Sequence, residues 1–217
     1  MSNYLAIATV TAVLRDILQE AANAAVPGAT VTTRRPEAAN DSGQNKPVVN
    51  IFLYRVTPNA AWRNIDIEIR HPGPGQPGDS AKGWTEKRSQ IPLNLDYLFS
   101  FYGNELELEP QRLLGSVVSA VHAHPRLSPQ AIQDTVGRAP HLRDSTLDLQ
   151  VAQTEYVKLT PISLSLEELS KLWSVFFQVP YALSVAYEAA AVLIETGEPR
   201  RAGFVQTVQI QPAEVMP

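Results

Sequence analysis

The segment Ile91–Tyr102, which reads IPLNLDYLFSFY, decides the fold class of this chain. Its residues alternate, so every second side chain falls on the same face of a β-strand. One face is apolar and aromatic, and it carries Leu93, Leu95, Tyr97, Phe99 and Phe101. The other face is mixed, and it carries Asn94, Asp96, Leu98, Ser100 and Tyr102. We therefore predict a long strand with its aromatic face in a core and Asp96 on the wetter face.

The segment Val48–Val56, VVNIFLYRV, predicts a second strand. Its nearly continuous apolar, β-branched and aromatic residues are typical of a central strand that is buried on both faces. We expect Pro58 to end it, because proline cannot donate a ladder hydrogen bond. Five weaker strands are predicted at Thr30–Arg34, Ile65–Arg70, Leu147–Leu159, Tyr181–Tyr187 and Phe204–Ile210.

Four helices are predicted from apolar residues that recur at spacings of three and four. The first covers residues 4–24 with Ser2 or Asn3 as its cap, and the second begins at Glu109–Pro110 and ends near His124. The third has Ser128 as its cap and Gly137 as its stop. The fourth opens with a capping box between Ser165 and Glu168 and runs to about Phe177, with Leu166 among its inward residues.

The order of these elements predicts one α+β domain with a mixed or mainly antiparallel sheet flanked by helices. Strands and helices do not alternate regularly, and no repeat of 20–50 residues is present. We place the domain at residues 1–195 and a C-terminal tail at 196–217. Phe204–Ile210 in that tail is a candidate added strand, and a disordered terminus is the alternative reading.

Composition excludes several classes of function. The 217 residues carry a net charge of −4 with no basic stripe, so we expect no nucleic-acid partner. The absence of cysteine excludes disulfides, thiolate nucleophiles and cysteine-based zinc sites. No apolar run approaches the roughly 20 residues of a bilayer span, and the N-terminus lacks the basic start of a signal peptide. We expect a protein made in the cytosol, without direct membrane insertion.

No motif for catalysis stands out, so we expect no catalytic, cofactor-binding or metal-binding residues. The Gly-rich segment that ends at Lys82–Gly83 is interrupted by prolines and does not fit a phosphate-binding loop. His122 and His124 stand two positions apart, whereas metal-binding pairs on helices usually stand three or four apart. The sequence also lacks a G-x-S-x-G nucleophile turn.

Three longer motifs carry a family resemblance. They are the strand Ile91–Gly103, the segment Leu108–Gly115, and the run from Val157–Pro161 through Leu164–Trp173 to Phe176–Tyr181. The start Asn3–Ala8 and the triplet Trp62–Asn64 fit the same pattern. Together they resemble the N-terminal domain of the cap, or tail-terminator, proteins of phage-like contractile injection systems of the extracellular virulence-cassette and antifeeding-prophage type.

The resemblance implies a structural protein without catalysis or cofactor. It implies a homo-oligomeric ring, a hexamer, that ends the tube and sheath distal to the baseplate and contacts the sheath and inner-tube proteins. The particle is either released or associated with a membrane. Candidate interface residues are Trp62, Arg63, Asn64, Trp84 after the Pro/Gly-rich loop, and Phe204, Val205, Val208 and Ile210 of the tail strand. The alternatives are another tail or baseplate adaptor subunit, and a small hydrolase or ligand-binding domain.

Overall fold

A computed structural model of the chain describes residues 4–36, 46–62, 66–71, 84–145, 157–176 and 179–203. The helices are α1 (Ala6–Ala25), α3 (Glu109–Ala123), α4 (Pro129–Arg138) and α6 (Leu166–Ser174). The strands are β1 (Thr30–Thr32), β2 (Val48–Pro58), β3 (Asp66–His71), β4 (Trp84–Tyr102), β5 (Lys158–Ile162) and β6 (Ser184–Gly203). Three short 3-10 turns accompany them: η1 (Ala60–Trp62), η3 (Glu105–Glu107) and η4 (Pro140–Leu142).

The strands form one mixed sheet in the order β1-β2-β4-β6-β5, and β3 pairs with β4. β1 runs parallel to β2, whereas β2 with β4 and β5 with β6 are antiparallel. The register of β2 and β4 runs from Val48 opposite Tyr102 to Pro58 opposite Leu93, with a bulge between Leu53 and Arg55. The predicted α+β class with a mixed sheet is confirmed.

The aromatic face of β4 forms the main core, as its alternation predicts. Leu95, Tyr97, Phe99 and Phe101 are at most 2% exposed and belong to one cluster. Phe99 stacks on Tyr187 of β6 with ring centroids 5.1 Å apart. β4 also begins at Trp84, seven residues before the predicted start, because its first part pairs with β3.

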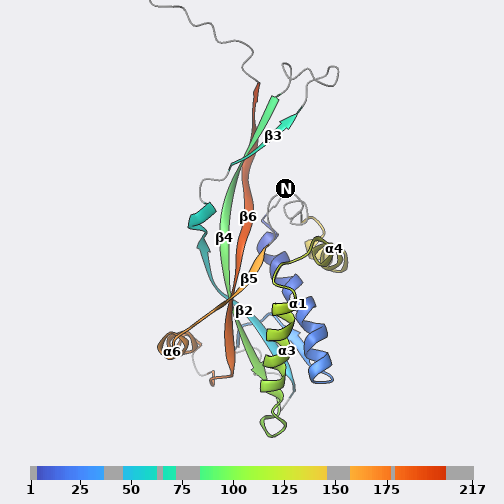
Figure 1. Cartoon of the computed structure of the whole chain (residues 1–217), viewed down its shortest axis with the longest axis vertical. Coiled ribbons are helices and arrows are strands. Elements are labelled where there is room, and N and C mark those ends of the chain that lie inside the picture. Colours follow the sequence, from blue (N-terminus) through green and yellow to red (C-terminus); the bar gives the residue numbers. More distant parts are fainter. Residues whose placement is uncertain are drawn as a thin grey trace, which may run out of the picture. The chain divides into compact units, whose positions relative to one another are not determined.

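Two long helices cover this face of the sheet. α1 buries Val10, Leu14 and Leu18, and α3 buries Leu113 and Val117 against the same core. Figure 1 shows α1 and α3 side by side. The Ser116 hydroxyl of α3 donates to the Ala21 carbonyl of α1 at 2.7 Å. α1 begins after Leu5 without a side-chain cap, and the candidate caps Ser2 and Asn3 lie outside the described residues.

The opposite face of the sheet carries α6. Leu98 of β4 packs there with Trp173 and Phe176, so the second face has a small core of its own. The predicted capping box is confirmed in both directions, since Ser165 accepts from the Glu168 amide and the Glu168 carboxylate accepts from the Ser165 amide. The expectation that Leu166 points inward is wrong, because this first residue of the helix lies beyond the sheet contact and is 84% exposed.

Other boundaries differ from the expectations. β2 continues through Pro58, and the expectation that Val48–Val56 is buried throughout is wrong. It is fully buried only from Val48 to Ile51, whereas Phe52, Leu53 and Tyr54 are partly buried against the two faces' clusters. α4 has the predicted Ser128 cap but continues through Gly137 and ends at Arg138, with Ala139 as its C-cap. β6 runs past Gly197 to Gly203, and β5 begins only at Lys158. Residues 146–156 and 204–217 lie outside the described residues.

The chain divides into two compact units. The first contains the described residues of 1–63 and 91–194, with the two cores and all four described helices. The second contains the described residues of 64–90 and 195–217, including the antiparallel pair of β3 with the start of β4. β6 contributes residues up to Ile194 to the first unit and residues from Glu195 to the second. The division into a domain at 1–195 and a tail at 196–217 stays a prediction.

Candidate assembly surfaces

The residues predicted for subunit contacts lie in different places. Trp62 ends the turn η1 and is half-buried, and its amide donates to the Asn59 side chain at 3.2 Å. Trp84 is the first residue of β4 and pairs with His71 of β3. Arg63, Asn64, Phe204, Val205, Val208 and Ile210 lie outside the described residues. Their role in contacts therefore stays a prediction.

A hydrogen-bonded ladder of polar side chains crosses β4 and anchors the turn that carries Trp62. The Asn59 side chain donates to Asn94 at 2.8 Å, and Asn94 donates to Glu188 of β6 at 2.9 Å. The Asn59 oxygen also accepts from the amides of Ala61 and Trp62. These bonds tie the turn that carries Trp62 to β4 and β6.

Asp96 is buried, and its predicted place on a wet face is wrong. Its side chain is 1% exposed and accepts from Arg55 Nε at 2.5 Å, while the Arg55 side chain is 59% exposed. The bulge beside Leu53 places Arg55 opposite Asp96, with the guanidinium 6.0 Å from the Tyr54 ring. The hydrogen bond to Asp96 raises the pKa of Arg55 above its usual value.

The turn between β4 and α3 projects apolar side chains into solvent. We call residues 103–109 the Leu106 loop, because Leu106 is 95% exposed and Leu108 is 58% exposed. Glu105 and Glu107 flank Leu106 and are exposed as well. Two leucines between carboxylates at an element end do not serve the core of this chain, so they suit a contact with another protein.

Four hydrogen bonds order the Leu106 loop. The Asn104 side chain accepts from the Leu106 amide at 3.0 Å, and the Leu108 amide donates to the Glu105 carbonyl at 3.1 Å. The Glu109 amide donates to the Asn104 carbonyl, and the buried Glu109 carboxylate accepts from the Asn104 amide at 2.7 Å. A side chain at Gly103 would place its Cβ 2.7 Å from that carboxylate, so glycine is required there.

Leu108 adopts a strained backbone conformation that displays its side chain. Its φ of 55° and ψ of 29° are left-handed, which costs a leucine about 1–2 kcal/mol. Such strain in an exposed apolar residue points to a role outside the folded core. Burying Leu106 and Leu108 against a partner would contribute at most about 6 kcal/mol. Since association costs about 4–15 kcal/mol, this contact holds only with the support of others.

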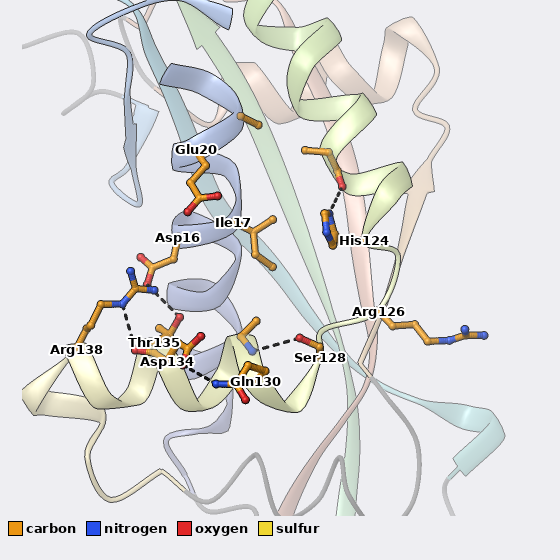
Figure 2. A pocket seen from close by; sticks show the side chains of 13 residues that line it. Asp16, Ile17, Glu20, His124, Arg126, Ser128, Gln130, Asp134, Thr135 and Arg138 are labelled. Carbon is orange, nitrogen blue, oxygen red and sulfur yellow. Dashed lines mark hydrogen bonds and ion pairs between the residues drawn. The ribbon is translucent and has the colours of Figure 1, made fainter. Parts of the chain in front are cut away.

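One cavity among the described residues lies between α1, the end of α3 and α4, with a volume of about 430 Å³. Figure 2 shows the carboxylates Asp16 and Glu20 of α1 facing Asp134 and Arg138 of α4. Asp16 accepts from Thr135 at 3.0 Å and from Arg138 at 3.1 Å, so it ties α4 to α1. The His124 ring lies 3.2 Å from the Ala120 carbonyl at the end of α3. The lining mixes charged, polar and apolar side chains, including the basic Arg126 and Arg138.

A second cavity, of about 260 Å³, lies between β5, the start of β6 and α6. We call it the β5–α6 groove. It is lined mainly by apolar residues, and among the described residues no charged side chain lines it. Pro161 in its wall belongs to β5, the last strand in the sheet order, and lacks an amide hydrogen. The groove is therefore an apolar surface at the edge of the sheet. At Pro161 the edge strand has no backbone N–H group to offer to another strand.

Two histidines near the end of α3 are the candidate metal pair in the sequence. His122 and His124 are both exposed. Within the described ranges, no group of three or more histidine, aspartate or glutamate residues is placed to hold a metal ion. Lys82 and Gly83 lie outside those ranges.

The geometry first defines a class: an α+β domain with a long-stranded mixed sheet, two helices on one face and a short capped helix on the other. The comparison of the sequence with family models then identifies the family. Residues 9–207 match the Pvc16 N-terminal domain, so the chain belongs to that family. This confirms the resemblance found in its motifs. No curated protein matches the sequence.

Two solved structures share the fold. A sheath/tube terminator of the extracellular contractile injection system PVC, in the extended state, superimposes with a TM-score of 0.55 at 13% identity over 93% of this chain. The tube-terminating cap of the anti-feeding prophage gives 0.55 at 12% identity over 91% of this chain. This chain covers 64% and 59% of those two chains, which is less than two thirds of either. At these identities the likeness concerns the fold.

Among the helices of the described residues, none is both long enough and apolar enough to cross a membrane.

Proposed function

We propose that this chain is a structural cap subunit of a phage-like contractile injection particle, which ends the inner tube and the sheath distal to the baseplate. The observation that carries the proposal is the family match over residues 9–207. The fold shared with a sheath/tube terminator and with a tube-terminating cap supports it. The role requires no catalytic residue and no cofactor, because it consists of binding neighbouring subunits.

The cap works as a homo-oligomeric ring, a hexamer, that contacts the sheath and tube proteins of the same particle. A closed ring needs two different surfaces on each copy, one that projects and one that receives. The Leu106 loop and the β5–α6 groove are two such surfaces of different shape. The subunit is made in the cytosol and becomes part of a particle that is then released or associated with a membrane.

The test is the length of the tube. The tube and sheath proteins of the particle are produced with and without this chain, and particle lengths are measured by electron microscopy. With the chain we expect a narrow distribution of lengths and a closed distal end. An unchanged length distribution in the presence of folded chain would contradict the proposal. A Phe99→Asp variant, which places a charge in the main core, is the unfolded control.

A further inference from the structure

The sheet of the first unit ends at the outermost strands β1 and β5, and β2 continues past β1. The edge of a sheet normally carries free amides and carbonyls, with which a strand of another protein can pair. We infer that each described edge of this sheet is closed to an added strand, so that strand pairing with another subunit is confined to the second unit. The inference goes beyond the proposed function, because it concerns the isolated chain.

The side chain of Gln19 on α1 occupies the outer edge of β1. Thr30 donates its amide to the carbonyl of Pro47, which precedes β2, at 3.1 Å. Amides alternate in direction along a strand, so the amide of Val31 points away from β2. It donates to Gln19 Oε1 at 2.9 Å, while Gln19 Nε2 donates to the Ala29 carbonyl at 2.8 Å. The side-chain amide therefore takes one donor and one acceptor that an added strand would need.

The outer edge of β5 is closed by a short stretch of chain after α3 and by a proline. The Leu127 amide donates to the Val157 carbonyl at 3.1 Å, and the bridge continues up the strand. The Leu159 amide donates to the Pro125 carbonyl at 2.8 Å, so it points away from β6. The next position with this direction is Pro161, which has no N–H group. An added strand finds no donor there.

The part of β2 that extends past β1 is irregular. β1 pairs with Val48–Asn50 only. Beyond this stretch a bulge lies between Leu53 and Arg55, the Arg55 side chain is 59% exposed, and the strand ends at Pro58. A bulge, a charged side chain and a proline each hinder strand addition at an edge. The three described edges of the first unit therefore share this property, although different residues provide it.

One consequence concerns the predicted tail strand Phe204–Ile210. Backbone pairing requires an edge with free donors and acceptors. The closed edges in the first unit of a neighbouring copy do not meet this requirement. The tail strand then has to pair with another protein or with the second unit of a neighbouring copy.

The test opens one edge and asks whether a strand adds there. Pro161→Val restores an outward amide on β5, and the variant is compared with wild type by sedimentation velocity over a range of concentrations. We expect species larger than those of wild type, in amounts that rise with concentration. In these species, residues 158–162 should exchange amide hydrogen for deuterium about tenfold more slowly than in the free variant, because the new amide is bonded.

Thr160→Val is the matched control. It introduces the same side chain one position earlier, where the amide points toward β6 and no outward donor is added. This control should keep the size distribution of wild type. Equal association of the two variants would overturn the inference, because the apolar side chain and not the amide would then be the cause. An unchanged size distribution for Pro161→Val would overturn it as well.

Gln19→Ala tests the edge of β1 separately. The Val31 amide should exchange about tenfold faster than in wild type, and the variant should associate. Gln19→Glu keeps the acceptor for this amide and should keep the amide protected. Circular dichroism confirms that each variant is folded, and Gln19→Glu decides with Pro161→Val if Gln19→Ala is not. A folded Gln19→Ala with unchanged exchange and unchanged size would show that Gln19 does not close this edge.

The two proposals fail separately. If the wild-type chain limits tube length but neither opened edge gains a strand, only the edge closure is wrong. If the opened edges gain strands but the wild-type chain leaves tube length unaffected, the edge closure stands and the cap function is wrong.

Discussion

At the scale of single residues, Leu108 has two properties that a contact with another subunit would explain and that folding of one chain does not. It combines a left-handed backbone with an exposed apolar side chain, and neither property helps an isolated domain. Asparagine tolerates this backbone better than leucine does. We expect Leu108→Asn to leave the free energy of unfolding unchanged or raised by about 1 kcal/mol. Urea titration of the purified chain checks this, and a loss of stability would show that Leu108 supports the fold.

The Arg55–Asp96 pair joins an exposed side chain to a buried one, so removing Arg55 should lower the stability of the fold. Arg55→Ala leaves the buried Asp96 carboxylate without its donor, and we expect a loss of about 1.5–3 kcal/mol in the free energy of unfolding. The exposed position of Arg55 lets water replace part of the interaction, so the larger cost of a fully buried pair does not apply. The matched control is Arg138→Ala, which removes an exposed partner of the less buried Asp16 and should cost below about 1 kcal/mol. Equal losses for both variants would contradict the special role of Asp96.

Tyr97 predicts how stability depends on alkaline pH. It is 0% exposed and its hydroxyl lies 2.9 Å from the Thr11 hydroxyl, and burial raises its pKa well above the usual range. Above pH of about 10 the unfolded chain loses this proton while the folded chain keeps it, so stability falls as pH rises. Each such tyrosine contributes a slope of about 1.4 kcal/mol per pH unit. Denaturant titrations between about pH 9 and 11 should show a weaker decline in Tyr97→Phe than in wild type.

At the scale of elements, α6 depends on its first turn more than a longer helix would. Among its nine residues Trp173 is buried against the sheet, together with Phe176, which follows the helix. Isolated helices of this length are unstable. The capping box supplies partners for amides that the helix cannot satisfy itself. The hydrogen bonds from the Ser165 backbone and side chain lower the pKa of Glu168, so this interaction is present at neutral pH and lost as pH falls through that lowered value.

Ser165→Ala should therefore cost about 1 kcal/mol in the free energy of unfolding. Ser170→Ala is the matched control on the same helix, because Ser170 is exposed and stands after the first turn. We expect that control to change stability by less than about 0.5 kcal/mol. Chemical denaturation followed by Trp173 fluorescence measures both, and equal effects would contradict a capping role.

At the scale of the whole molecule, the long strands β4 and β6 contribute residues to both compact units. A truncation therefore has to respect β6, which continues to Gly203. Deletion of residues 204–217 removes the predicted tail strand Phe204–Ile210 and leaves β6 complete. We expect the truncated chain to keep its thermal stability and to bind the sheath protein at least tenfold more weakly, because an added strand supplies backbone hydrogen bonds. Pull-down with purified sheath protein measures this, and undiminished binding would exclude the tail from the contact.

The sequence by itself determined the features that depend on neighbouring residues along the chain. Alternation in Ile91–Tyr102 predicted the strand and its core face, and the spacing of Ser165 and Glu168 predicted the start of α6. The order of the motifs predicted the family. These features are local, because side-chain period and capping act within a few residues.

Only the tertiary structure decided features that depend on distant segments. Asp96 is buried because a bulge in β2, about 40 residues earlier, brings Arg55 opposite it, and alternation along β4 carries no trace of that bulge. The groove combines β5, β6 and α6, and the close approach of Gly103 to Glu109 joins the end of β4 to the start of α3. Such features arise from packing between elements, and the pattern of residues within one element does not encode them.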